Sequence, residues 1–267
     1  MTAKEFQKLI WAYYRKNKRP MPWRETVDPY RIFVSEIMLQ QTQVARVLEK
    51  YPHFIKRFSS FSVLAKASPS SVLALWQGLG YNRRALFLKK SAEIIVQDYH
   101  GVLPKDFEKL KSLPGIGPGT AGSLMAFAFN VPVVFIETNI RRVFIHYFFP
   151  KKKKVSDEMI MPYIAAALDK KSPREWYWAL MDHGAMLAQT GENPNRRSKH
   201  YTKQKKFEGS LRQVRGAIIR TLLERSSMTS QGLMQELGYD VERTEKALES
   251  LCEDGFLVKK RNTYRVA

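Results

Sequence analysis

The chain has 267 residues, with 45 Lys and Arg against 25 Asp and Glu, and a formal net charge of +20. This length allows one large or two modest domains with real cores, and the positive excess favours nucleic acid as the partner over an acidic protein or a membrane surface. The single cysteine, Cys252, excludes an internal disulfide and an all-cysteine metal cluster.

The N-terminus leads into an amphipathic pattern and not into a signal peptide, and the sequence has no apolar run of ~18 residues. We therefore expect a cytoplasmic protein without a membrane span, associated with the nucleoid if it is bacterial. A surface that is merely basic and has no specific partner would give the same charge.

Apolar residues recur with helical spacing along most of the chain, which predicts an all-α fold class. Proline, glycine and capping residues mark the boundaries of the expected elements. The expected helices are 6–14, 29–51 (one long helix or two), 63–66, 68–77, 83–99, 107–113, 120–130, 138–149 and 157–168. The core candidates of the second are Ile32, Phe33, Ile37, Leu39, Val44 and Leu48.

Two basic stretches interrupt this pattern. Lys151–Lys154 is expected to be an exposed loop, with phosphate contact as the alternative. Residues 191–210 are polar and basic, so they are interpreted as a linker or as a surface loop that crosses DNA. We expect residues 1–190 to form the main domain and residues 211–267 a second one.

The pattern after residue 210 predicts three short helices over 211–224, 229–237 and 241–254, then a basic hairpin that turns at Arg261 and Asn262. This order is typical of a winged-helix-like domain. The third helix carries four glutamates, which suits a groove-reading helix poorly. Contact with DNA, through phosphates bound by the hairpin, and contact with a protein partner both remain open.

The segment Leu113–Gly122 predicts a tight hairpin between two helices. Gly115 and Gly117 tolerate left-handed backbone or the close approach of another chain, and Pro118 suits the first turn of the second helix. Backbone N–H groups at such a helix start point outward and can hold a phosphate. We therefore predict that Gly115 and Gly117 contact DNA.

Two glutamates are candidates for chemistry. Glu36 has apolar neighbours, and burial among them would raise its pKa, as a general acid near neutral pH requires. Glu137 follows an apolar run and begins a helix, where the dipole favours the ionised form. The local pattern of Glu36 also fits an ordinary surface glutamate, and that of Glu137 also fits a carboxylate that only caps the helix. One protonated and one ionised carboxyl is the arrangement used to cleave glycosidic bonds.

From about Leu9 to Ala188 the chain resembles the helix-hairpin-helix (HhH-GPD) base-excision DNA glycosylases, the superfamily of endonuclease III. Within that superfamily it is most similar to the MutY-type adenine glycosylases, which remove adenine mispaired with 8-oxoguanine. The matching segments are Met21–Arg24, Ser35–Val44, Trp76–Tyr81, Leu113–Gly117 and Met181–Met186. The resemblance implies two helical lobes, with double-stranded DNA across the cleft between them and the target nucleotide flipped out of the helix.

The resemblance also implies roles for single residues. Glu36 takes the place of the acid that protonates the adenine ring, and Glu137 that of the carboxylate that stabilises the sugar cation. Gln41 matches the wedge inserted into the duplex. The remaining expected DNA contacts are Arg24, Thr42, Leu79 and Tyr81, the last three at the opposite purine. The hairpin at Gly115 and Gly117 often holds an alkali cation in the family.

Four departures from the family pattern affect these expectations. Glu137 stands where the family has aspartate, and Gly119 stands where bifunctional relatives have a Schiff-base lysine. The four cysteines that bind an iron–sulfur cluster are absent, so no cofactor is expected, and Arg196, Arg197 and Lys199 of the corresponding loop are expected to contact DNA instead. The winged-helix-like segment stands in place of the family's 8-oxoguanine-reading domain.

These observations predict a monofunctional DNA glycosylase of base excision repair without lyase activity, most suited to adenine opposite 8-oxoguanine or guanine. Removal of thymine or uracil opposite guanine is one alternative. A catalytically silent protein that binds particular DNA structures is the other.

Overall fold

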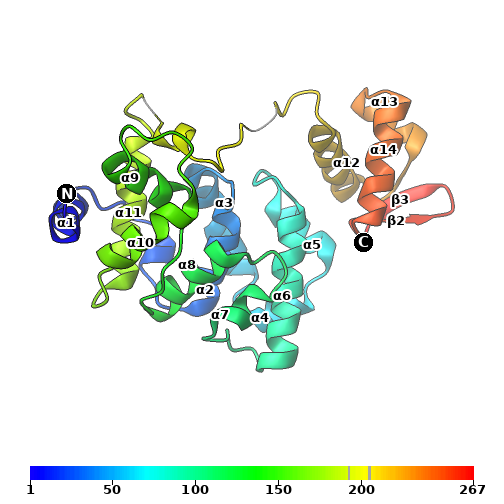
Figure 1. Cartoon of the computed structure of the whole chain (residues 1–267). Helices are drawn as coiled ribbons and strands as arrows, with labels where there is room; N and C mark the ends of the chain where they lie inside the picture. The colour runs from blue at the N-terminus through cyan, green and yellow to red at the C-terminus, as the bar shows by residue number, and fades with distance from the viewer. Residues whose placement is uncertain (192, 204–205) are drawn as a thin grey trace. The chain divides into compact units, whose positions relative to one another are not determined.

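The computed structural model describes residues 1–191, 193–203 and 206–267, and these are mostly helical (Figure 1). The α-helices are α1 (Ala3–Asn17), α2 (Pro29–Leu39), α3 (Val44–Arg57), α4 (Phe61–Lys66), α5 (Pro69–Trp76), α6 (Arg83–Tyr99), α7 (Phe107–Lys111), α8 (Pro118–Phe129), α9 (Thr138–Phe148), α10 (Asp157–Ala167), α11 (Pro173–Leu187), α12 (Leu211–Arg225), α13 (Ser230–Leu237) and α14 (Val241–Glu253). The short 3₁₀ helices are η1 (Pro22–Arg24) and η2 (Pro194–Arg197), and the strands are β1 (Met228–Thr229), β2 (Leu257–Lys260) and β3 (Thr263–Val266). The all-α prediction is confirmed, and among the described helices none is both long and apolar enough to cross a membrane.

The chain divides into two compact units, and each unit combines two separate segments. Unit 1 contains Met1–Glu36 and Leu103–Lys203. Unit 2 contains Ile37–Val102 and the described part of Gln204–Ala267. The border therefore passes through α2, directly after Glu36.

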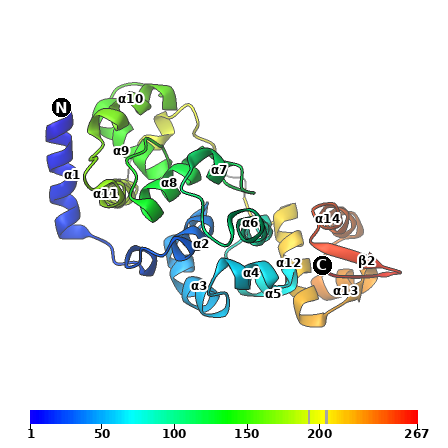
Figure 2. The same cartoon turned by 90° about the horizontal axis from the view of Figure 1, so that it is seen from below.

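The core of unit 1 is an aromatic cluster where α1, α9, α10 and α11 pack together (Figure 2). Phe6 of α1 is fully buried, and its ring lies 5.0 Å from that of Phe144 and 6.1 Å from that of Trp176. Gly184 of α11 allows a close approach between helices, because a Cβ atom there would lie 2.5 Å from the carbonyl oxygen of Asn139. This contact presses α11 against the first turn of α9.

The first segment of unit 2 is built from α3, α4, α5 and α6 around the buried rings of Phe54, Phe58 and Trp76. The predicted element 29–51 is two helices, because the backbone turns between α2 and α3, where Gln41 has a φ of 53°. That turn resets the helical phase. Leu48 is therefore 39% exposed, against its prediction as a core residue, and Val47 is buried instead.

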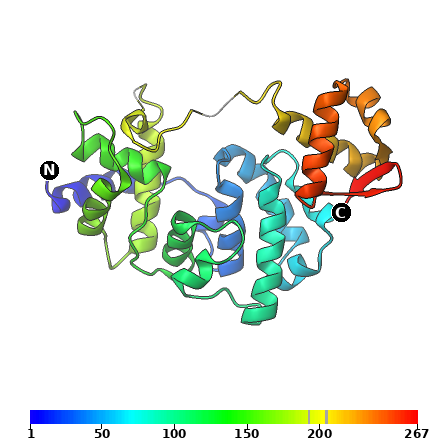
Figure 3. The same cartoon turned by 45° about the vertical axis from the view of Figure 1, so that its right-hand side comes forward.

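The second segment of unit 2 has the winged-helix order (Figure 3). The Thr229 hydroxyl accepts a hydrogen bond from Gly232 N–H and begins α13, as predicted. The hairpin turns at Arg261, whose φ is 54°, and β3 pairs antiparallel with both β2 and β1. We call residues 211–267 the winged-helix domain. The exposed side chains of Lys259, Lys260 and Arg261 make its hairpin basic.

Candidate active site and DNA-contacting elements

Glu36 lies on α2 and contacts Ser123 of α8, whose Oγ is 2.6 Å from Glu36 Oε2 and 2.9 Å from the carbonyl oxygen of Thr120. Burial raises the pKa of Glu36 to about 7; the Ser123 hydrogen bond opposes the rise, Glu137 adds to it and Arg24 opposes it. The expected rise in this pKa is confirmed.

Ser123 has a single hydroxyl hydrogen for these two neighbouring oxygens. When Glu36 is ionised, that hydrogen goes to its carboxylate. When Glu36 is protonated, its own O–H can donate to Ser123 Oγ, and the Ser123 hydroxyl then donates to the Thr120 carbonyl. These contacts therefore fit both charge states of Glu36. A general acid must adopt both in turn, because it gives its proton and then regains one.

Replacing Glu36 with glutamine is expected to raise the free energy of unfolding at pH 8 by up to about 3 kcal/mol. Folding raises the pKa of Glu36 from 4.5 to about 7. Stability from its protonated form is thus fully present below pH 4.5 and is lost as the pH rises through about 7, whereas glutamine has no proton to lose. Urea denaturation at pH 5 and pH 8 measures the difference. The exposed Glu49→Gln variant is the control, and an equal change at both pH values would contradict the prediction.

Glu137 is the N-cap of α9, so the capping interpretation is also correct. Its Oε1 accepts hydrogen bonds from the N–H groups of Asn139 and Ile140, both at 2.7 Å, and Asn139 Nδ2 donates to Oε2 at 3.3 Å. Burial nevertheless raises the pKa of Glu137, and the two backbone N–H groups, Arg142 and Arg141 oppose that rise. Its position at a helix start had predicted an ionised Glu137. That sequence pattern reflects the helix dipole but not the free-energy cost of burying a charge.

Arg142 anchors the first turn of α9. Its buried guanidinium donates to Asn139 Oδ1 at 2.6 Å, to the carbonyl oxygen of Gly184 at 2.8 Å and to Asn193 Oδ1 at 3.2 Å. Asn195 Nδ2 donates to the carbonyl oxygen of Thr138 at 2.9 Å. The segment around η2 is therefore tied to the helix start that holds Glu137.

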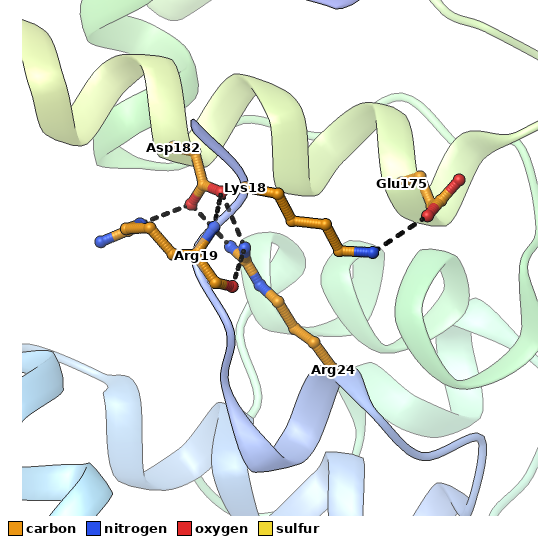
Figure 4. A network of polar contacts seen from close by, with 5 residues as sticks. All are labelled: Lys18, Arg19, Arg24, Glu175 and Asp182. Atoms are coloured by element: carbon orange, nitrogen blue, oxygen red, sulfur yellow. Dashed lines mark hydrogen bonds and ion pairs between the residues drawn. The ribbon is translucent and has the colours of Figure 1, made fainter. Parts of the chain in front are cut away.

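Arg24 forms a buried ion pair with Asp182 (Figure 4). Its side chain is 4% exposed, and both terminal nitrogens donate to the Asp182 carboxylate, at 2.9 and 3.0 Å. Arg19 Nε and backbone N–H donate to the same carboxylate, at 2.6 and 3.2 Å. Arg24 also lies over the Trp178 ring. It joins η1 to α11 in this structure, and its contact with DNA stays a prediction.

The predicted hairpin is present between α7 and α8. Gly115 has a φ of 76°, a left-handed conformation that glycine adopts without strain, and both Gly115 and Gly117 are exposed. The buried Ile116 between them anchors the turn through its N–H, which donates to the carbonyl oxygen of Leu113 at 3.1 Å. Exposed backbone at the start of a helix can bind a phosphate or, through carbonyl oxygens, a cation. Both remain predictions.

No sequence pattern pointed to Arg84, a buried residue of α6. Its terminal nitrogens donate to the carbonyl oxygens of Ile37, Met38, Leu79 and Gly80 and to Thr42 Oγ1, at 2.8 to 3.2 Å. One guanidinium thus joins the turn after α2 to the turn after α5.

These two turns hold four predicted DNA contacts. Gln41 is exposed and Tyr81 is 37% exposed, each with a positive φ. The Leu79 side chain is only 3% exposed and its carbonyl oxygen accepts a hydrogen bond from Arg84, so its contact with DNA stays a prediction. The Thr42 hydroxyl lies between Arg84 and Leu79 and fixes the turn.

The loop at η2 stands where the resemblance implied an iron–sulfur cluster. Four thiolates would be needed, and the chain has one cysteine, Cys252, in the winged-helix domain. Within the described residues, no group of three or more His, Cys, Asp or Glu side chains is arranged to hold a metal. The donor set therefore does not fit the cluster. Of the predicted loop 191–210, residues 192, 204 and 205 lie outside the described residues.

Backbone and side-chain hydrogen bonds hold this loop. Val155 N–H donates to the Arg197 carbonyl oxygen, and Lys199 N–H donates to that of Val155, both at 2.8 Å. The Arg197 guanidinium donates to the carbonyl oxygens of Phe149 and Pro150. Arg197 is only partly exposed, whereas Arg196 and Lys199 are exposed, and the contacts of all three with DNA stay predictions.

The double variant Arg196→Ala, Lys199→Ala is expected to bind every duplex more weakly and to flatten the dependence of affinity on salt by close to one unit of slope per lost phosphate contact. Fluorescence anisotropy at several salt concentrations measures both. In contrast, Arg197→Ala is expected to lower the melting temperature, because it removes the bonds that close the loop. An unchanged salt dependence of affinity in the double variant would show that the two side chains face solvent and contact no phosphate.

Comparisons with known proteins agree with this geometry. Residues 34–164 match the family model described as HhH-GPD superfamily base excision DNA repair protein. An adenine DNA glycosylase of Mycobacterium tuberculosis is 32% identical, over 94% of this chain and 89% of that protein. The chain belongs to the HhH-GPD superfamily of base excision DNA repair proteins.

Three further similarities accompany the HhH-GPD assignment. An adenine DNA glycosylase of Buchnera aphidicola is 35% identical over 68% of this chain, which spans 52% of that protein's length. The structure of a thermostable thymine-DNA glycosylase matches with a TM-score of 0.65 and 25% identity, over 72% of this chain and 90% of that one. A trapped endonuclease III–DNA covalent intermediate matches with a TM-score of 0.61 and 15% identity, over the same shares, and supports the fold alone.

Proposed function

We propose that this HhH-GPD protein removes adenine from mispairs in duplex DNA by hydrolysing the N-glycosidic bond, opposite 8-oxoguanine or guanine. One observation carries the proposal: Glu36, whose pKa is raised to about 7, lies within electrostatic reach of a second carboxyl whose pKa is also raised, that of Glu137. The names of the relatives, adenine DNA glycosylase, support the choice of base.

In the proposed reaction, Glu36 gives its proton to a ring nitrogen of the flipped adenine, so that the base accepts the bonding electrons and leaves neutral. Positive charge develops on the sugar as the bond breaks, and the Glu137 carboxylate stabilises it. Water then adds to the sugar carbon, and a carboxylate takes up its proton. The product is an abasic site in an uncut strand.

Duplexes with a single adenine opposite 8-oxoguanine, guanine or cytosine test this function, with thymine and uracil opposite guanine included. After incubation, hot alkali cleaves the strand wherever a base has been lost. Release of adenine is the expected result. Release of thymine or uracil alone would favour the second candidate, which the likeness to the thymine-DNA glycosylase supports. Binding without any release would favour a silent DNA-binding protein.

Absence of lyase activity is the finer part of the proposal and is supported by Gly119. No amine is available at this position, and a Cβ atom added there would lie 3.2 Å from the carbonyl oxygen of Ile136, a tight contact. Borohydride treatment with abasic DNA is therefore expected to trap no covalent adduct. A strong adduct would identify another amine as the nucleophile.

A further inference from the structure

Polar side-chain contacts join the winged-helix domain to the first segment of unit 2. Asp254, which follows α14, forms ion pairs with Arg83 of α6 and Arg215 of α12. Arg212, in the first turn of α12, donates from a terminal nitrogen to the Tyr81 hydroxyl at 3.0 Å. Arg215 also contacts the Ser250 hydroxyl, so α12 and α14 are held together at this edge.

The Arg212 contact involves the exposed turn after α5. The Arg212 guanidinium carbon lies 5.8 Å from the centre of the Tyr81 ring, and that of Arg84 lies 5.6 Å from it. Arg84 simultaneously fixes the carbonyl oxygens of Leu79 and Gly80. Tyr81 is thus an exposed aromatic ring on a fixed turn, and its hydroxyl accepts a hydrogen bond from an arginine of the winged-helix domain.

We propose that Arg212 is a specificity-determining residue that acts with Tyr81 to recognise the purine opposite the excised base. This inference rests on the proposed function and on the contact between Tyr81 and that purine that the family resemblance implies. A guanidinium is planar and matches paired acceptors on a purine edge, such as O6 and N7 of guanine. A base against the Tyr81 ring lies within reach of an arginine that already touches the same ring.

The basic hairpin of the same domain is suited to a different task. Lys259, Lys260 and Arg261 are exposed at its tip, and contacts from such side chains to phosphates position a protein without reading sequence. Arg212 differs because its position is defined by the Tyr81 contact and by the Asp254 ion pairs that hold α12. Mutations in the hairpin and at Arg212 are therefore expected to have different effects on DNA binding.

Binding to product duplexes tests the inference in the full chain. Each duplex carries an abasic site opposite 8-oxoguanine, guanine or cytosine, and anisotropy gives the three dissociation constants. Arg212→Ala and Arg212→Lys are expected to reduce the preference for a purine over cytosine by about tenfold, because lysine keeps the charge and loses the planar fork. Arg220→Ala, an exposed arginine of the same helix, is the control and is expected to keep the preference.

Two results would overturn the inference. One is an equal loss of affinity for all three duplexes in both Arg212 variants, which would make Arg212 a phosphate contact. The other is an unchanged set of constants. Since these duplexes contain no base to release, the test stays decisive if the wild-type protein excises no adenine, and that failure would count against the proposed function alone.

Discussion

Glu36→Gln is expected to reduce single-turnover base release by about 10³-fold while changing duplex affinity by less than about threefold. Glutamine keeps the shape of the side chain and can still accept the Ser123 hydrogen bond, but it has no proton to give. Rapid-quench measurement of base release and anisotropy of binding separate the two effects. Release at the wild-type rate would remove Glu36 from the reaction.

The pH profile gives an independent check on the same residue. Base release by the wild-type protein is expected to fall as the pH rises through about 7, because Glu36 then loses its proton. In Ser123→Ala this fall is expected at a higher pH, since the hydrogen bond that favours the ionised form is gone. A shift to lower pH would show that Ser123 instead favours the protonated form.

Glu137→Gln is expected to lower base release by about 10²- to 10³-fold. The amide oxygen can still accept the N–H groups of Asn139 and Ile140, so α9 keeps its cap, while the negative charge opposite the developing sugar cation is lost. Single-turnover rates and the melting temperature distinguish lost chemistry from a disturbed helix. A large fall in melting temperature would mean that the cap itself had failed.

The matched variant is Glu137→Asp, which keeps the charge and shortens the side chain by one methylene. Aspartate is a strong N-cap residue and can hold the same two N–H groups. We expect base release to be kept or raised, because aspartate is the residue that the resemblance implies at this position. Complete loss of release would mean that the site is built around the longer side chain.

Local patterns predicted most helix boundaries because the residues that end helices act on their own neighbours. The expected range 83–99 coincides with α6, and Glu137 begins α9 as expected. Helix α11 was missed even though the motif Met181–Met186 lies within it. Leu48 was misplaced because a helical phase cannot be continued across a turn.

The surroundings of the arginines at the site were harder to predict. Arg24 and Arg197 are basic residues in matching or basic segments, and sequence alone cannot distinguish a cation held by Asp182 or by carbonyl oxygens from one that faces a phosphate. Arg84 serves five acceptors, four of them backbone carbonyls, which carry no sequence signature at all. Partners distant in sequence decide each case.

The two-segment construction of unit 1 has a consequence for synthesis on the ribosome. Phe6 packs against Phe144 and Trp176, so the first helix is made long before its partners exist. At about 5–20 residues per second, the roughly 170 residues that separate Phe6 from Trp176 take on the order of 10–30 s to translate. Until Phe144 and Trp176 have both been made, the apolar face of α1 lacks its full set of partners. The nascent chain is then most exposed to aggregation, and this is when chaperone binding would protect it best.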